Sequence, residues 1–155
     1  MISPELLRRY PFFGFLDDTQ LKAVAMIAEE IAVETGELIL EAGQPAEALY
    51  FLLDGSTELC TIVTDQVRPE SRKEFYISDV NPGEILGISA LVEPYRYTGT
   101  ARARGPCRII KIEAFPLREL CAKDLKLAYG LMRETAKAAM ERLHDTRVQL
   151  AAARA

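Results

Sequence analysis

The sequence predicts an α+β fold: an antiparallel β-roll of the jelly-roll type, flanked by N-terminal helices and by a long C-terminal helix. Two observations carry this prediction. From Ile31 to Glu113, short β-prone runs are separated by turn signals about every 8–12 residues. From about Asp124 to about Ala152 there is no proline, and strong helix formers dominate. That tail predicts one helix roughly 40 Å long at 1.5 Å per residue.

The N-terminal segment predicts a shorter helix. An apolar stretch, Pro11 to Leu16, leads into Asp17 and Asp18, either of which is a suitable N-cap. Apolar residues then recur at helical spacing. They are Leu21, Val24, Ala25, Ile27 and Ala28.

The middle of the chain predicts six short strands separated by glycine and proline turns. Many short antiparallel strands imply a sandwich, a roll or a barrel, because closure hides the sheet edges. We interpret the pattern as a roll closed by the C-terminal helix. The predicted strands are Leu38–Leu40, Ala48–Leu53, Thr57–Val63, Glu74–Val80, Thr98–Arg104 and Arg108–Ile112.

Length and composition indicate one ordinary globular domain. The 155 residues are 49% apolar and 27% charged, with a net charge of −4, which argues against a nucleic-acid polycation. No run reaches the ~18 apolar residues of a membrane span, and no secretory signal follows Met1. The three widely spaced cysteines form no disulfide framework. We therefore expect a cytoplasmic protein, with residues 1–122 forming the roll and its N-terminal helices and residues 123–155 a helix of the same domain.

The ordered set of turns resembles the cyclic nucleotide-binding domain family, which includes catabolite activator protein, protein kinase A regulatory subunits and gated channels. The resemblance spans about Pro11 to Leu150 and implies the β-roll fold. It also implies a regulatory function with a cyclic nucleotide as ligand. The segments that carry it are Gly36–Ile39, Gly43–Ala46, Leu49–Gly55, Pro82–Gly87 and Thr98–Ala103.

The resemblance places a phosphate-binding cassette at Gly87, where a short helical turn through Ile88, Ser89 and Ala90 would present its first amides to a cyclic phosphate. The family's cassette carries a glutamate for the ribose and, nine or ten residues later, an arginine for the phosphate. Here Ile88 takes the glutamate position and Tyr97 the arginine position. Taken without the family, Gly87 is better explained as a residue that merely allows a sharp strand-to-helix bend.

Arg96 offers a replacement cation, because it lies one residue before the expected position at the end of a loop. A one-residue offset inside a strand would turn its side chain to the opposite face, whereas a bulge could aim it at the phosphate. An arginine exposed to solvent is the alternative. The hydroxyls of Ser89 and Thr98 could also donate to a phosphate or cap local backbone.

The C-terminal helix carries a stripe with alternating steps of three and four residues, as in a coiled-coil seam. By the resemblance, this helix would form a homodimer and close over the ligand. The alternative is that the stripe packs on its own β-roll. No helix-turn-helix follows the helix, so we expect no direct DNA binding. The stripe comprises Leu125, Ala128, Met132, Thr135, Ala139, Leu143, Thr146, Leu150 and Ala153.

The sequence contains no recognisable catalytic or metal-binding motif. His144 is the single histidine and falls in the charged helix, and Cys60 falls in a predicted strand without an evident base. We therefore expect a non-enzymatic sensory module that requires no cofactor and takes cAMP, cGMP or another phosphate-bearing molecule. The alternative is a degenerate domain that binds no nucleotide and acts as a dimerisation or docking scaffold. The candidate site is Gly87, Ile88, Ser89, Ala90, Arg96, Tyr97 and Thr98.

Overall fold

The computed structural model describes residues 1–64, 66–68 and 70–155. Its strands are all antiparallel and form two four-stranded sheets, ordered β1-β8-β3-β6 and β2-β7-β4-β5. This arrangement confirms the predicted α+β roll. The elements are α1 (Pro4–Arg8), η1 (Pro11–Phe15), α2 (Asp18–Met26), β1 (Ala28–Val33), β2 (Leu38–Leu40), β3 (Ala48–Asp54), β4 (Thr57–Thr64), β5 (Arg72–Val80), β6 (Ile85–Leu86), η2 (Ile88–Leu91), β7 (Thr100–Ala103), β8 (Cys107–Glu113), α3 (Ala114–Lys123) and α4 (Leu125–Ala153).

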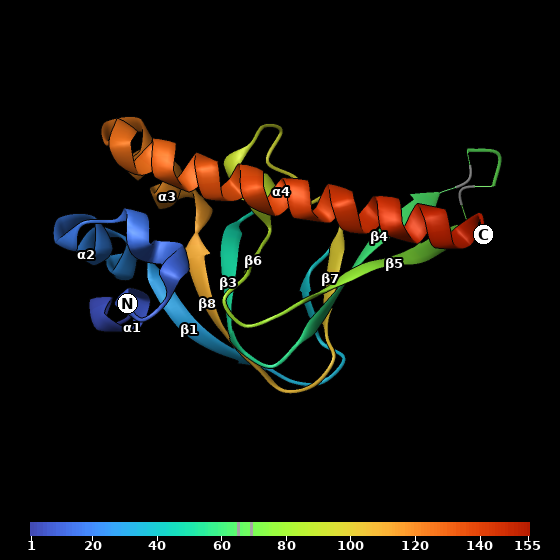
Figure 1. The fold of residues 1–155 in the computed structure, drawn as a ribbon, viewed down its shortest axis with the longest axis horizontal. Helices are drawn as coiled ribbons and strands as arrows, with labels where there is room; N and C mark the ends of the chain where they lie inside the picture. Colours follow the sequence, from blue (N-terminus) through green and yellow to red (C-terminus); the bar gives the residue numbers. More distant parts are fainter. Residues whose placement is uncertain (65, 69) are drawn as a thin grey trace.

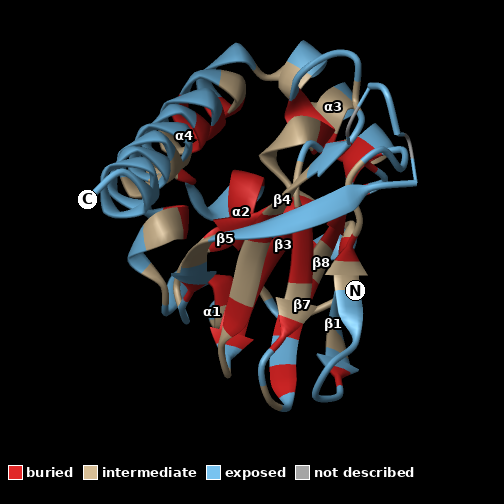
Figure 2. Ribbon diagram, turned by 90° about the vertical axis from the view of Figure 1, so that its right-hand side faces the viewer, coloured by how far each residue is buried: buried red, intermediate tan, exposed pale blue. Residues whose placement is uncertain are grey.

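The core lies between the two sheets and beneath the N-terminal helices. Strand β3 is buried along all but its last residue (Figure 2). Phe51 is fully buried and lies within 5.6 Å, ring centroid to centroid, of Tyr10, Phe12 and Phe13. This aromatic cluster holds the N-terminal helices against the roll.

Helix α4 lies across one side of the roll and runs from α3 towards the far end of β5 (Figure 1). Asp124 caps its N-terminus by accepting a hydrogen bond from the Leu127 amide at 3.0 Å. The fully buried residues of the helix all lie in its first eleven positions. They are Leu127, Gly130, Leu131 and Thr135.

Two sequence-based expectations for the secondary structure are wrong. The helix at Asp18 ends at Met26, and Ala28 instead begins β1, which pairs with β8 along six residues. Backbone pairing across the sheet therefore outweighs the helical spacing of Ile27 and Ala28. The strand expected from Thr98 begins at Thr100, so Thr98 lies in the preceding loop. Helices α1 and α3 were not anticipated.

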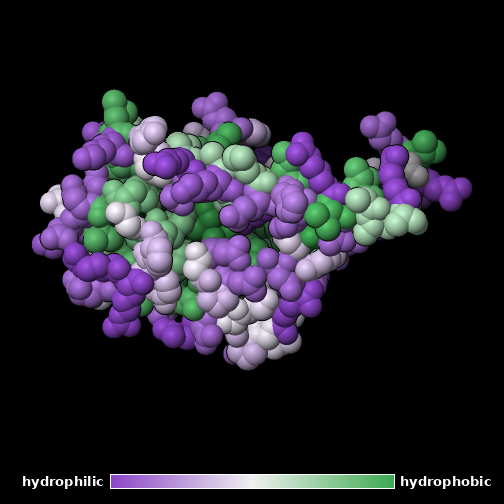
Figure 3. Space-filling view, in the orientation of Figure 1, coloured by the Kyte–Doolittle hydropathy of each residue, from purple (hydrophilic) through white to green (hydrophobic). Residues whose placement is uncertain are grey.

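The coiled-coil stripe proposed for the last helix mostly faces away from the roll. Leu125, Met132, Leu143 and Leu150 are exposed, whereas Thr135 is buried. Figure 3 shows apolar surface near the C-terminal end of α4, where Val148 and Leu150 are exposed. Among the described residues, no helix is both long and apolar enough to cross a membrane.

Candidate functional site

A cavity of about 230 Å³ lies between the roll and α4. Its walls come from β2, β4 and β5, from the turn after β6, from the loop before β7 and from α4. Both the sheet and the helix therefore contribute side chains to one space. The lining residues are Leu40, Leu59, Cys60, Thr61, Ile77, Gly87, Ile88, Ser89, Tyr97, Thr98, Gly99, Arg142 and Thr146.

Gly87 turns the chain from β6 into η2 in a conformation that only glycine adopts readily, with φ 78° and ψ 37°. The surroundings would also crowd a side chain, and its neighbours would have to shift by a few tenths of an ångström. A Cβ atom there would lie 3.0 Å from Tyr97 Cε1 and 3.1 Å from the Ala48 carbonyl oxygen. The turn that leads into the cavity wall therefore requires glycine for two independent reasons.

Tyr97 fills the space below this turn. Its side chain is buried, and its hydroxyl donates to the Ala48 carbonyl oxygen at 2.6 Å and accepts from the Ala48 amide at 3.2 Å. Burial raises the pKa of Tyr97, and burial together with Tyr97 raises the pKa of the neighbouring Tyr50 to about 12. Both phenols therefore stay neutral near pH 7 and act as hydrogen-bonding groups.

The residues after Gly87 divide between the cavity and the core. Ile88 and Ser89 line the cavity and are each half-buried. Ala90 is fully buried behind them: its amide donates to the Gly87 carbonyl, and its own carbonyl accepts from Arg118 Nε at 2.7 Å. Ala90 thus supports the turn from behind.

Arg96 is exposed and does not line the cavity. Its guanidinium donates to the Gly43 carbonyl at 2.9 Å. The Tyr97 amide donates to the Gln44 carbonyl at 3.0 Å in the same short ladder, so successive side chains point in opposite directions. Tyr97 points inward and Arg96 outward, whereas Thr98 lies exposed at the cavity rim.

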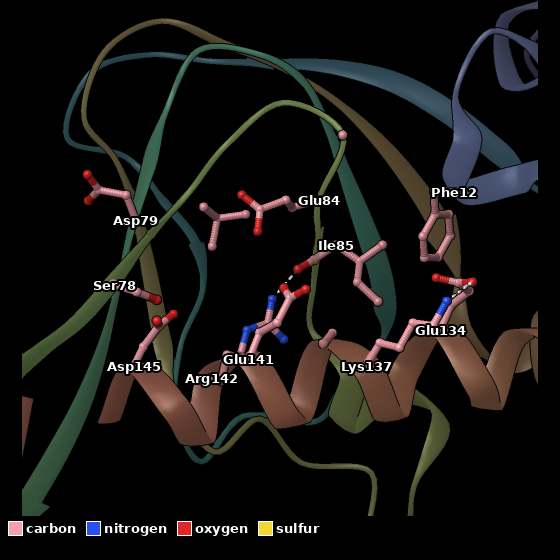
Figure 4. A pocket seen from close by; sticks show the side chains of 13 residues that line it. Phe12, Ser78, Asp79, Glu84, Ile85, Glu134, Lys137, Glu141, Arg142 and Asp145 are labelled. Atoms are coloured by element: carbon pink, nitrogen blue, oxygen red, sulfur yellow. Dashed lines mark hydrogen bonds and ion pairs between the residues drawn. The ribbon is translucent and has the colours of Figure 1, made fainter. Parts of the chain in front are cut away.

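Arg142, on α4, is a site residue that sequence reasoning missed. It is partly buried, and its guanidinium donates to the Ile85 carbonyl (Figure 4). Desolvation lowers the pKa of Arg142, whereas nearby Glu84, Glu141 and Asp145 favour its charged form. The sequence does contain a signal for this position. Arg142 follows at steps of three or four residues on the helix face that packs against the roll, and it is the charged residue of that series. The series is Leu127, Leu131, Thr135, Ala138 and Arg142.

Comparisons with known proteins decide the family. The sequence profile of the cyclic nucleotide-binding domain matches residues 30–124. A solved structure from Geobacter metallireducens GS-15, named for cyclic nucleotide binding, is 40% identical with a TM-score of 0.79, over 93% of this chain and 100% of that one. The chain belongs to the cyclic nucleotide-binding domain family.

Curated relatives of this family are longer proteins. The cAMP-activated global transcriptional regulator CRP of Pasteurella multocida is 26% identical over 72% of this chain and 49% of its own length. A protein of Rhodopseudomonas palustris named as a potassium channel is 22% identical over 83% of this chain and 29% of its own length. The chain thus spans less than half the length of either. Domains of this family are regulatory rather than catalytic.

The cavity lies between the turn at Gly87 and helix α4. Ile88 and Tyr97, which the sequence resemblance places at the family's glutamate and arginine positions, supply neither a carboxylate nor a cation to the cavity. The thiol of Cys60 is part of the wall, and burial raises its pKa, which disfavours the reactive thiolate.

Proposed function

We propose that this chain is a non-enzymatic sensory module that takes cAMP or cGMP in the cavity between the roll and α4 and signals through that helix. The observation that carries the proposal is that one cavity is lined by the cassette turn, through Gly87 and Ser89, and by α4, through Arg142 and Thr146. A ligand there contacts both parts at once.

The cavity size supports a moving helix. Its volume of about 230 Å³ is smaller than the ~300–1,000 Å³ of typical small-molecule pockets. We infer that a bound nucleotide would displace α4 outward. Because a ligand favours the state to which it binds more tightly, binding would change the population of helix positions. We propose Gly87, Ile88, Ser89, Tyr97 and Thr98 as the contacting residues, with Ala90 supporting the turn and Arg96 at its outer edge.

Weak binding is expected. The missing glutamate and arginine would each contribute a charge-assisted hydrogen bond worth ~1.5–3 kcal/mol. Since a thousandfold change in Kd corresponds to about 4 kcal/mol, we expect a Kd of tens of micromolar or weaker. Calorimetric titration with cAMP and cGMP, on protein first checked for co-purified nucleotide, tests this expectation. A submicromolar Kd would show that other groups replace both partners fully.

The occupied cassette positions favour a second candidate function. The bonds of Tyr97 to Ala48 and the packing of Ile88 against the core hold the cassette in place without any ligand. A domain with these features could serve as a dimerisation or docking scaffold. Absence of binding to both nucleotides at millimolar concentration would favour this scaffold.

A further inference from the structure

The cavity has a one-sided charge distribution. Among the described residues that line it, Arg142 is the one with a formal charge, and no aspartate or glutamate is present. Leu40, Leu59 and Ile77 form an apolar wall, and Ser89 and Thr98 add hydroxyl groups. A cavity with one cation, hydroxyl donors and an apolar wall is complementary to an anion with an apolar body.

The Arg142 guanidinium is also under-paired. It donates to the Ile85 carbonyl, and within the described parts of the chain no carboxylate forms an ion pair with it. A guanidinium has five N–H donors, so one carbonyl leaves most of them available. Because a partly desolvated charge is costly unless it is paired, an anion arriving in the cavity would find a cation that gains from pairing.

The carboxylates that favour the charged form of Arg142 do not line this cavity. Glu84, Glu141 and Asp145 line a separate hollow of about 150 Å³ between the turn before β6 and α4 (Figure 4). Arg142 lines both spaces. These three acids favour the charged form of Arg142, and none of them lines the cavity.

We propose that Arg142 of α4 is the cation that pairs with the anionic group of the ligand in this cavity, assisted by the hydroxyls of Ser89 and Thr98. This inference rests on the proposed function and names the chemistry of its ligand. A single guanidinium neutralises one negative charge, so the site favours a singly charged phosphodiester over a monophosphate ester, which carries about −1.5 to −2 at neutral pH. The anion contact then lies on the moving helix.

Calorimetry with cAMP, AMP and adenosine tests the pairing at fixed ionic strength. Arg142→Gln retains a donor for the Ile85 carbonyl but removes the charge. We expect it to weaken cAMP binding about 10- to 100-fold and to leave adenosine binding within about twofold. Arg147→Gln is the matched control, since Arg147 is an exposed arginine of the same helix outside the cavity and should change neither. In the wild type, cAMP should bind more tightly than AMP.

Other outcomes overturn the pairing. If Arg142→Gln weakened the binding of cAMP and of adenosine by the same factor, Arg142 would contact the nucleoside part of the ligand and not its phosphate. If Arg96→Ala abolished cAMP binding while Arg142→Gln left the cAMP affinity unchanged, the anion would bind at Arg96 in the loop. Thermal melting without ligand verifies that each variant is folded.

A second experiment tests the anion site at Arg142 independently of cyclic-nucleotide binding. If the wild type binds neither cAMP nor cGMP, the sensory function fails, and the anion site is tested by thermal melting with dimethyl phosphate, a singly charged phosphodiester. Stabilisation of the wild type but not of Arg142→Gln supports an anion site at Arg142. Equal effects on both proteins, or none on either, overturn it.

Discussion

The Gln20 side-chain amide donates a hydrogen bond to the Asp124 carboxylate at 2.9 Å, which joins the N-termini of α2 and α4 across 104 residues of sequence. Gln20 is buried, and its oxygen also accepts from the Asp17 amide at 2.9 Å. The Asp17 carboxylate accepts a hydrogen bond from the Gln20 backbone amide, which completes a capping box. One side chain therefore links the caps of two helices.

The first prediction concerns pH. The hydrogen bond from Gln20, followed by that from the Leu127 amide, lowers the pKa of Asp124 below its ordinary value. The stabilisation is therefore present above the unfolded-state pKa, about 3.9, and is lost as the pH falls through the lower folded-state pKa. Asp124→Asn should show a shallower loss of stability between about pH 5 and 2 in urea unfolding. Gln20→Met should also reduce the change in the free energy of unfolding with pH. If neither variant changed this pH dependence, the hydrogen bond between Gln20 and Asp124 would not stabilise the fold.

The second prediction concerns Gly130, which lies against the Phe15 ring with no room for a Cβ atom. In a helix interior, alanine is favoured over glycine by about 1 kcal/mol. Overpacking costs ~1–3 kcal/mol, so Gly130→Ala should lower the melting temperature. The double variant with Phe15→Leu should recover part of the loss. A more stable single variant would show that the ring moves aside freely.

The third prediction isolates the hydroxyl of Tyr97. Tyr97→Phe keeps the ring but leaves the amide and carbonyl of Ala48 without this partner. We expect a loss of about 1–3 kcal/mol in the free energy of unfolding without ligand. Tyr95→Phe is the control, because the ring contact of Tyr95 with the Arg118 guanidinium does not need the hydroxyl. Equal losses in the two variants would argue against the Ala48 bonds as the cause.

The fourth prediction restores the missing acceptor. Ile88→Glu places a carboxylate in the cavity wall, at the position that the sequence resemblance assigns to the family's glutamate. Cyclic-nucleotide affinity should rise about tenfold or more, with Ile88→Gln as the uncharged control. Calorimetry gives the affinity, and urea unfolding gives the stability. Strong destabilisation without any gain in affinity would show that the cassette has become core, as the scaffold candidate requires.

The fifth prediction concerns assembly. Along α4, Tyr129, Met132, Met140, Leu143 and Leu150 expose apolar side chains on one face, away from the roll. We expect a homodimer through this face, with Leu143→Glu shifting the protein to monomer in light scattering at ~100 μM. Met26→Glu, at an exposed apolar residue of α2, should leave the dimer intact. A monomeric wild type at this concentration would refute the expectation.

Turn chemistry made most of the roll predictable from sequence. Asp54-Gly55 indicates a tight turn, and the structure joins β3 to β4 there, with Gly55 at φ 93°. The end of α2 was not predictable in this way, because Ala28 pairs with Ile112, 84 positions further along the chain. Local spacing cannot report a partner so distant.

Only those residues of the candidate site that lie close together in the sequence were predictable. The turn at Gly87 and the nearby Ser89 and Tyr97 follow from sequence order alone. Arg142 does not, because its place in the cavity depends on which face of α4 packs on the roll. The predicted seam through Leu143 and the buried face through Leu131 differ in their position around the helix, and only tertiary packing distinguishes them.

Because α4 packs tightly at Gly130, a rigid movement of the helix would pivot about this residue. Gly130 lies against the Phe15 ring and the buried residues of the helix end at Thr135, whereas residues 147–155 are exposed. At 1.5 Å per residue, Arg142 lies about 18 Å from Gly130 and Ala153 about 35 Å. For a rigid rod pivoting at Gly130, a 1 Å displacement at Arg142 becomes about 2 Å at the tip. Under the proposed signalling through α4, a displacement at Arg142 would therefore be roughly doubled at the end of the helix.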